Sequence, residues 1–202
     1  MKQIRAKFEK SDIAALPKVL FEGRIIVILS EREADRAVDY LLRQPILGFD
    51  TETRPSFRRG QMHKVALLQV STRDTAFLFR LNRIGLTDSI VRLLEDKRVL
   101  KVGLSLKDDM HNLRLRRDFQ PGTYVELQQE VQRLGVEDMS LQKLYANLLG
   151  GRISKTQQLT NWEADVLTEA QQRYAATDAW ACIQIHREIE RLLQTGDYQL
   201  IE

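Results

Sequence analysis

The runs ILGFDTE at residues 46–52, KVALLQVS at 64–71 and TAFLFRL at 75–81 follow one another closely in the chain and indicate its central sheet. All three runs are rich in the aliphatic, β-branched and aromatic residues that favour strands. Only residues 72–74 separate the second run from the third, and so short a connection predicts a hairpin. We therefore expect the three runs to form an antiparallel meander.

Hydrophobic periodicity predicts helices and further strands on both sides of this meander. The expected elements are a short helical arm at the start, a strand over 24–29, an amphipathic helix over 31–43, a helix over 87–96, a strand over 98–104, a short extended piece over 123–127 and a last helix that ends at Gly196. A meander followed by alternating helices and strands predicts an α/β fold with a mixed sheet flanked by helices.

The composition is typical of a single globular domain. The chain has 202 residues, 43% of them hydrophobic and 29% charged, and we expect one domain over 1–202 with residues 1–22 as an N-terminal arm. No apolar run approaches the roughly 20 residues that span a bilayer, so no membrane association is expected. The single cysteine, Cys182, excludes an internal disulfide and a cage of cysteines around zinc, and predicts a reducing, cytoplasmic setting.

The net charge of +3 permits a polyanionic partner without requiring one. Its distribution is more informative, because no acidic residue lies between Glu52 and Asp74. That interval holds five cationic residues, namely Arg54, Arg58, Arg59, Lys64 and Arg73. The interval could be an ordinary solvated loop, but it directly follows a pair of carboxylates.

Asp50 and Glu52 form that pair. Residues i and i+2 of a strand point to the same face, so the two carboxylates would lie side by side at the end of an apolar strand. Like charges at this spacing repel each other. Either the strand ends at Phe49 and both acids are solvated, or they share a cation, for which hard oxygen ligands suit Mg²⁺ or Mn²⁺.

The last helix carries a third acid on its apolar stripe. Thr168 and Gln171 have the spacing of a capping box. Asp178 follows Tyr174 by one turn and shares the stripe with residues that face the core. A carboxylate in that position needs a hydrogen-bond donor or a metal. Tyr174 alone would be an ordinary core tyrosine.

The helix expected after Ser105 offers two neighbouring acids. Ser105 is a good N-cap residue, and Asp108 stands three residues later, at the position that completes a capping box. Asp109 has the spacing that places it on the same face as Leu106 and Leu113. We therefore assign Asp109 to the site and Asp108 to the cap, with Asp108 as the alternative ligand.

With these residues in hand, the chain resembles the 3′→5′ exonucleases of the ribonuclease D and Werner type, which carry four acidic residues and a tyrosine. The first motif is Asp50-Thr-Glu52, the second is KVGLSLKDDMHNL at 101–113, and the third is Tyr174-Ala-Ala-Thr-Asp178. The segment KTQQLTNWEADVLTEAQQRYAATDA at 155–179 is similar to the family's sequence before and through the third motif.

The resemblance implies a ribonuclease H-like fold and a two-metal site held by Asp50, Glu52, Asp109 and Asp178, with Tyr174 placing the attacking water. It implies single-stranded or 3′-overhanging nucleic acid as the partner. Contacts to the strand are expected from Arg54, Phe57, Arg58, Arg59, Lys64, Lys155, Gln158 and Trp162. Because the chain ends soon after the third motif, we expect none of the C-terminal helical nucleic-acid-binding domains that ribonuclease D carries.

Two other functions stay open at the level of sequence. A catalytically inactive nucleic-acid-binding module could keep the same fold, although all four acids are present. A phosphatase or nucleotide hydrolase could use the same metal cluster, although the tyrosine and the basic interval count against it. The sequence does not distinguish DNA from RNA, or Mg²⁺ from Mn²⁺.

Overall fold

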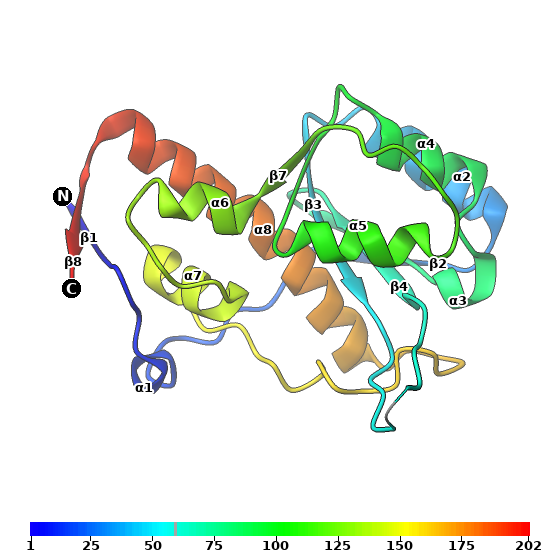
Figure 1. Ribbon diagram of the computed structural model, residues 1–202, viewed down its shortest axis with the longest axis horizontal. Coiled ribbons are helices and arrows are strands. Elements are labelled where there is room, and N and C mark those ends of the chain that lie inside the picture. Colours follow the sequence, from blue (N-terminus) through cyan, green and yellow to red (C-terminus); the bar gives the residue numbers. More distant parts are fainter. Residues whose placement is uncertain (59) are drawn as a thin grey trace.

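In a computed structural model, residues 1–58 and 60–202 are described, and they contain a mixed sheet of six strands (Figure 1). In spatial order the strands are β2 (Arg24–Ile28), β5 (Thr75–Phe79), β4 (Leu67–Ser71), β3 (Ile46–Glu52), β6 (Leu100–Gly103) and β7 (Tyr124–Glu126). Strands β3, β4 and β5 pair antiparallel, which confirms the predicted meander. The other pairs, β2 with β5, β3 with β6 and β6 with β7, are parallel.

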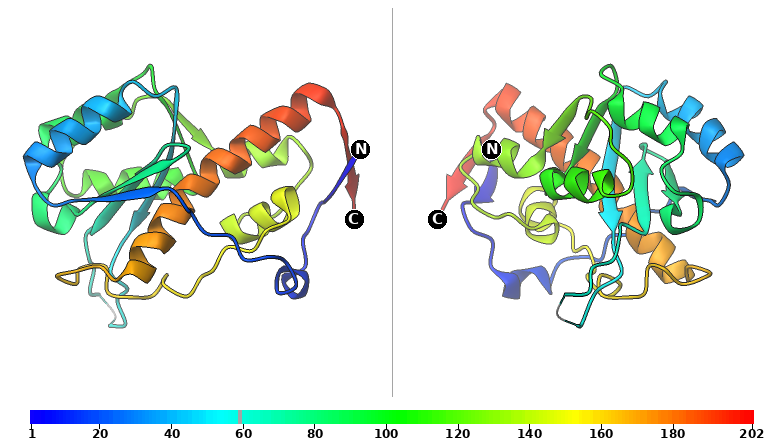
Figure 2. Two further views of the ribbon diagram at one scale, coloured as in Figure 1. Left: turned by 180° about the vertical axis from the view of Figure 1, so that it is seen from behind. Right: turned by 45° about the vertical axis from the view of Figure 1, so that its right-hand side comes forward.

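Helices cover both faces of this sheet, as expected (Figure 2). One face packs against the 27-residue helix α8 (Glu169–Thr195), which contacts β3, β4 and β5. The other face lies under α2 (Glu31–Leu41), α4 (Asp88–Glu95) and α5 (Leu106–Arg114). The remaining helices are α1 (Lys10–Ile13), α3 (Leu81–Ile84), α6 (Leu127–Gln132) and α7 (Leu141–Leu149).

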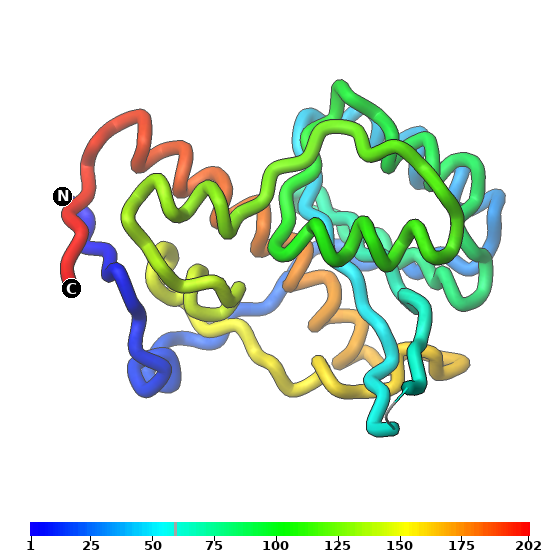
Figure 3. Tube along the Cα trace, viewed as in Figure 1, coloured from blue at the N-terminus to red at the C-terminus, as the bar shows by residue number. Residues whose placement is uncertain are grey.

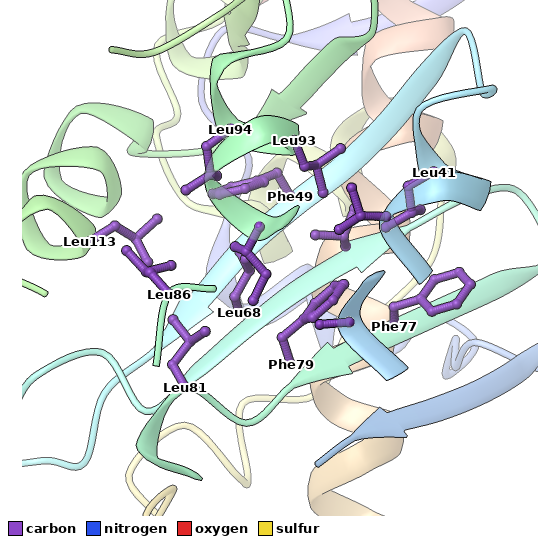
Figure 4. Close-up of a cluster of buried hydrophobic side chains, with 14 of the residues drawn as sticks. Leu41, Phe49, Leu68, Phe77, Phe79, Leu81, Leu86, Leu93, Leu94 and Leu113 are labelled. Carbon is purple, nitrogen blue, oxygen red and sulfur yellow. The ribbon is translucent and has the colours of Figure 1, made fainter. Parts of the chain in front are cut away.

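The alternation of strand side chains divides the core into two layers. Leu47 and Phe49 of β3 point toward α2, α4 and α5, where Leu68, Phe79 and other large apolar side chains meet them (Figure 4). The residues between them, at positions 48, 50 and 52, therefore point to the face that α8 covers. The pleat of a single strand thus brings Asp50 and Glu52 under the last helix.

Gly48 sets how closely that helix approaches. A Cβ atom at this position would lie 1.8 Å from the carbonyl oxygen of Ala179, so only glycine leaves room for the α8 backbone against β3. The start of α8 is fixed by the predicted capping box, in which Thr168 accepts a hydrogen bond from the Gln171 amide. Gly196 ends the helix in the left-handed conformation. Asp178, next to Ala179, is thereby held beside the end of β3.

The N-terminal arm differs from the helical arm that the sequence predicts. It starts with a strand, β1 (Lys2–Arg5), which pairs in parallel with β8 (Tyr198–Ile201) at the end of the chain. Both termini therefore lie together, at the left of Figure 3. After the short α1, the arm runs beside residue 152, where Val19 donates to the Arg152 carbonyl and the Arg152 amide donates to Pro17.

Several element boundaries also differ from the prediction by one to three residues. The strand expected over 75–81 ends at Phe79, because Leu81 already begins α3. The strand expected over 64–71 begins at Leu67. In the part of the chain that is described, no helix has both the length and the apolar character needed to cross a membrane.

Candidate active site

Three carboxylates from two elements meet at the end of β3. Asp50 and Glu52 come from the strand and Asp178 from α8, and each offers an oxygen that lies within 4.8 Å of the other two. They line a cavity of about 290 Å³ together with Tyr174 and Cys182. The structure thus brings together three acids that are far apart in the chain.

Burial and mutual repulsion make these carboxylates reluctant to ionise. Burial, and then the charges of Asp50 and Asp178, raise the pKa of Glu52 to about 10. Burial and the charge of Asp178 also raise the pKa of Asp50. Burial raises the pKa of Asp178 to about 7, although the Tyr174 hydroxyl and the charge of Lys155 oppose that rise. A bound cation would remove the repulsion that all three share.

Hydrogen bonding indicates the same need. Within residues 1–58 and 60–202, the buried oxygens Asp178 Oδ1 and Asp109 Oδ2 have no hydrogen-bond partner. Buried polar atoms are normally satisfied, so an orphaned carboxylate oxygen in an acidic cluster points to a ligand. An all-oxygen set fits a hard divalent metal ion.

Asp109 approaches the cluster from the other side of the sheet. It lies in the first turn of α5 and is half-buried, and one of its oxygens accepts a hydrogen bond from the Thr51 hydroxyl. The pKa of Asp109 is raised by burial and by the charge of Asp50. Asp108, its neighbour, is exposed. Of the two acids, Asp109 is therefore the one beside the cluster, although it is not among the three acids whose oxygens lie within 4.8 Å of one another and it does not line the cavity.

The predicted cap at Ser105 is wrong. Ser105 adopts the left-handed conformation, with φ of 62°, and its side chain makes no capping hydrogen bond. The start of α5 is capped instead by Glu126, whose carboxylate accepts from the backbone amides of Ser105 at 3.0 Å and Leu106 at 2.7 Å. Asp108 therefore does not complete a capping box.

Tyr174 lines the cavity next to Asp178, and Trp162 packs against Tyr174. Tyr174 is 7% exposed, and burial followed by the charge of Asp178 raises the pKa of its hydroxyl, which stays protonated at neutral pH. Its ring lies 6.0 Å from that of Trp162, centroid to centroid. Trp162 is fully buried, so it cannot contact a strand as the sequence suggested. It supports Tyr174 instead.

The other predicted nucleic-acid contacts fall into two groups. Lys155 and Gln158 line the acidic cavity itself. Phe57, Arg58 and Lys64 are exposed in the loop after β3, while Arg54 is ion-paired with Glu163 at 3.3 Å. Arg59 lies outside the described residues.

Sequence reasoning missed Gln69. This side chain is fully buried, faces Asp50 across the β3–β4 pair, and has neither amide atom hydrogen-bonded to any described residue. A polar residue inside the apolar run KVALLQVS was the signal that could have revealed it. Cys182 lies beneath the same acids, and burial with their charges raises the pKa of its thiol. It is therefore a protonated core residue.

Comparison with known proteins places this geometry in a family. A family model described as 3'-5' exonuclease matches residues 25–194. The mouse protein "Bifunctional 3'-5' exonuclease/ATP-dependent helicase WRN" is 30% identical over 157 residues, which cover 75% of this chain. The chain spans only 11% of the length of that relative.

Solved structures agree on the fold. The Nibbler EXO domain of Aedes aegypti superposes with a TM-score of 0.79 at 22% identity, over 92% of this chain and 95% of that one. Trypanosoma brucei RNase D in complex with RNA U12 has a TM-score of 0.71 at 19% identity, over 84% of this chain and 63% of that one. The expected ribonuclease H-like fold is thus confirmed. From its match over residues 25–194 and its cluster of acids, the chain belongs to the 3'-5' exonuclease domain family.

Proposed function

We propose that this chain is a metal-dependent 3′→5′ exonuclease that hydrolyses phosphodiester bonds from the 3′ end of DNA or RNA and releases nucleoside monophosphates. One observation carries the proposal. In a domain of the 3'-5' exonuclease family, Asp50, Glu52 and Asp178 offer oxygens within 4.8 Å of one another, beside the protonated hydroxyl of Tyr174.

Two divalent cations, Mg²⁺ or Mn²⁺, are the proposed cofactors. Asp50, Glu52 and Asp178 would hold them, with Asp109 as the fourth ligand. Bound ions of this kind supply a water of lowered pKa and stabilise the negative charge that grows on the attacking and leaving oxygens. The orphaned oxygens of Asp178 and Asp109 support this assignment.

The remaining side chains orient the reactants. The Tyr174 hydroxyl, which is held in place by Trp162, would donate a hydrogen bond to the attacking water and fix its direction. Thr51 would hold the Asp109 carboxylate in its orientation through their hydrogen bond. Lys155, which lines the same cavity, would contact a phosphate next to the scissile bond.

The proposed partner is a single strand or a 3′ overhang. Phe57 is 84% exposed and could stack on a base, while Arg58 and Lys64 are exposed in the same loop and could meet phosphates. Arg54 could join them if the strand displaced its exposed ion pair, which costs little. Backbone and stacking contacts do not read sequence, as suits an enzyme that accepts any 3′-terminal base. The RNA bound to the similar T. brucei RNase D supports a nucleic-acid substrate.

A gel assay tests the proposal. Wild type, Asp178→Ala and Asp108→Ala would be incubated with single-stranded DNA and RNA, blocked at the 3′ or the 5′ end, in Mg²⁺, Mn²⁺ or EDTA. Asp108 is the matched control, because it is an acid near the site but exposed. We expect wild type and Asp108→Ala to shorten strands stepwise from a free 3′ end in the presence of metal. EDTA should abolish this activity, and the Asp178→Ala variant should lack it.

The same gel can contradict the proposal in two ways. If the Asp178→Ala variant still shortened the strands, the acidic cluster would not be required for catalysis. Strands that bind but are never shortened, under either metal, would indicate an inactive binding module instead. The better-digested strand distinguishes DNA from RNA.

A further inference from the structure

A second cavity opens beside the acidic one. It has a volume of about 680 Å³ and shares Ser140, Gln142 and Lys155 with the acidic cavity. Because Lys155 lines both cavities and its charge acts on Asp178, the two sites meet at that residue. A molecule bound at the carboxylates could therefore continue into the second cavity.

The second cavity is strongly cationic. Five basic residues line it, namely Lys10, Lys18, Lys143, Arg152 and Lys155. No carboxylate does so in the described part of the chain. Among residues 1–58 and 60–202, only Lys143 of these five has a salt-bridge partner, Asp138 at 2.9 Å. The other four cations repel one another, so an anion bound among them is favoured.

The N-terminal arm builds one wall of this cavity. Lys10 and Lys18 come from the arm, and the opposite wall comes from residues 140–155. The arm is fixed to that wall by backbone hydrogen bonds on both sides of Lys18, which pairs with Arg152 in an isolated parallel bridge. It is also fixed at Phe8, whose amide donates to Asp138 at 2.6 Å. The cavity is thus held by specific contacts.

Two features suit the cavity to a nucleic-acid strand. Its cationic side chains fit phosphate groups, and its apolar lining by Ile13, Ala14 and Ile153 fits sugars or bases. Lys10 and Lys18 precede residues 25–194, which the family model matches, so this wall is a feature of this chain outside the matched domain.

We propose that the cavity is a second phosphate-binding site, which holds the strand on the 5′ side of the scissile bond while the 3′ end lies among the carboxylates. This proposal rests on the proposed function for the direction of the strand. The bound group is either an internal phosphodiester of a long strand or the 5′-terminal phosphate of a short oligonucleotide. The site adds affinity for strands long enough to reach it.

The test removes the two cations of the arm. The double variant Lys10→Gln/Lys18→Gln changes two exposed side chains, and Arg36→Gln/Lys97→Gln is the control with the same change in net charge on other exposed side chains. Steady-state kcat and KM would be measured in Mg²⁺ on single strands of increasing length, from dinucleotides upward, with and without a 5′-phosphate. The dissociation constant would be measured in EDTA for the same strands.

For a long strand, we expect KM to rise about tenfold in the arm variant, with kcat within about twofold of wild type, because two phosphate contacts are lost. The slope of log Kd against log salt concentration should decrease by about one to two, which corresponds to the loss of one to two phosphate contacts. If the arm variant raises KM for dinucleotides only when they carry a 5′-phosphate, the cavity binds the terminal phosphate. An effect on longer strands with either 5′ end identifies internal phosphodiesters.

The proposal is overturned if KM, Kd and the salt dependence of the arm variant equal those of wild type at every length. The binding measurement needs no catalysis, so it separates this proposal from the proposed function. If wild type degraded no strand, the exonuclease assignment would fail. The Kd of the arm variant in EDTA would still decide whether the cavity binds phosphate.

Discussion

Replacing Asp178 by asparagine should make the metal-free protein more stable while it removes the metal response. The substitution keeps the size of the side chain and an oxygen that can accept from Tyr174, but it removes one buried negative charge. The pKa of Asp178 rises from an ordinary 3.8 to about 7, because of its burial among the other acids. Above pH 7 this carboxylate is therefore ionised at a cost to the fold.

The size of that cost follows from the rise in the pKa of Asp178. A rise of one in a pKa corresponds to about 1.4 kcal/mol, so a carboxylate moved from 3.8 to about 7 destabilises the metal-free fold at pH 8 by up to about 4 kcal/mol. For a chain of this size, each kcal/mol moves Tm by roughly 2–4 °C. The Asp178→Asn protein in EDTA should thus melt on the order of 10 °C above wild type.

The assay is thermal unfolding at pH 8 in EDTA and in excess Mg²⁺. Wild type should gain stability on adding Mg²⁺, because the ion binds only the folded protein, whereas Asp178→Asn should gain much less. The control Asp108→Asn, at an exposed acid near the cluster, should match wild type in both conditions. A variant that melts below wild type in EDTA would refute the electrostatic reasoning, since it would mean that Asp178 stabilises the metal-free fold.

Four further outcomes are expected. Asp109→Asn should lower exonuclease activity at least tenfold, because Asp109 lies beside Asp50 and bonds to Thr51. Asp108→Asn should leave the activity within about twofold, because Asp108 is exposed. Equal effects of the two variants in the gel assay would contradict this. Glu126→Gln should cost about 1–2 kcal/mol in denaturant unfolding, because Glu126 accepts two backbone hydrogen bonds at the start of α5. Gly48→Ala should cost about 3 kcal/mol or more, or prevent folding, because its Cβ would meet the Ala179 carbonyl at 1.8 Å; a soluble variant with an unchanged Tm would exclude that clash. The Mg²⁺-induced rise in Tm should grow between pH 5 and pH 8. As the pH rises, the acids with raised pKa ionise, which destabilises the metal-free fold and lets them bind the ion. A rise in Tm that is independent of pH would contradict the raised pKa values.

The features that the sequence predicts correctly are those set by local patterns. The meander follows from three apolar runs and a short turn, and the structure pairs them antiparallel. The capping box at Thr168 and the stop at Gly196 are local signals and are observed. The alternation of side chains along a strand puts Asp50 and Glu52 on one face of the sheet, and helical periodicity puts Asp178 on the inward face of the last helix. These two surfaces face each other in the structure.

The features that it misses depend on contacts between distant residues. The cap of α5 comes from Glu126, some 20 residues after Ser105, so the local Ser105 signal was misleading. The indole of Trp162 is buried by packing against Tyr174, which no local pattern shows. The pairing of β1 with β8 joins four-residue strands from opposite ends of the chain. The basic cavity likewise combines residues from the arm with residues 140–155.

The parallel pairing of β1 with β8 also determines how the domain would resist a mechanical load. Because the strands run in the same direction, a force that pulls Met1 away from Glu202 drags them past each other along their length. The four registered residue pairs from Lys2 with Tyr198 to Arg5 with Ile201 then carry the load together, in shear. Two antiparallel strands pulled from one end would separate one residue pair at a time. The parallel β1–β8 pair should instead hold the two ends of the chain together until its backbone hydrogen bonds break in a single step.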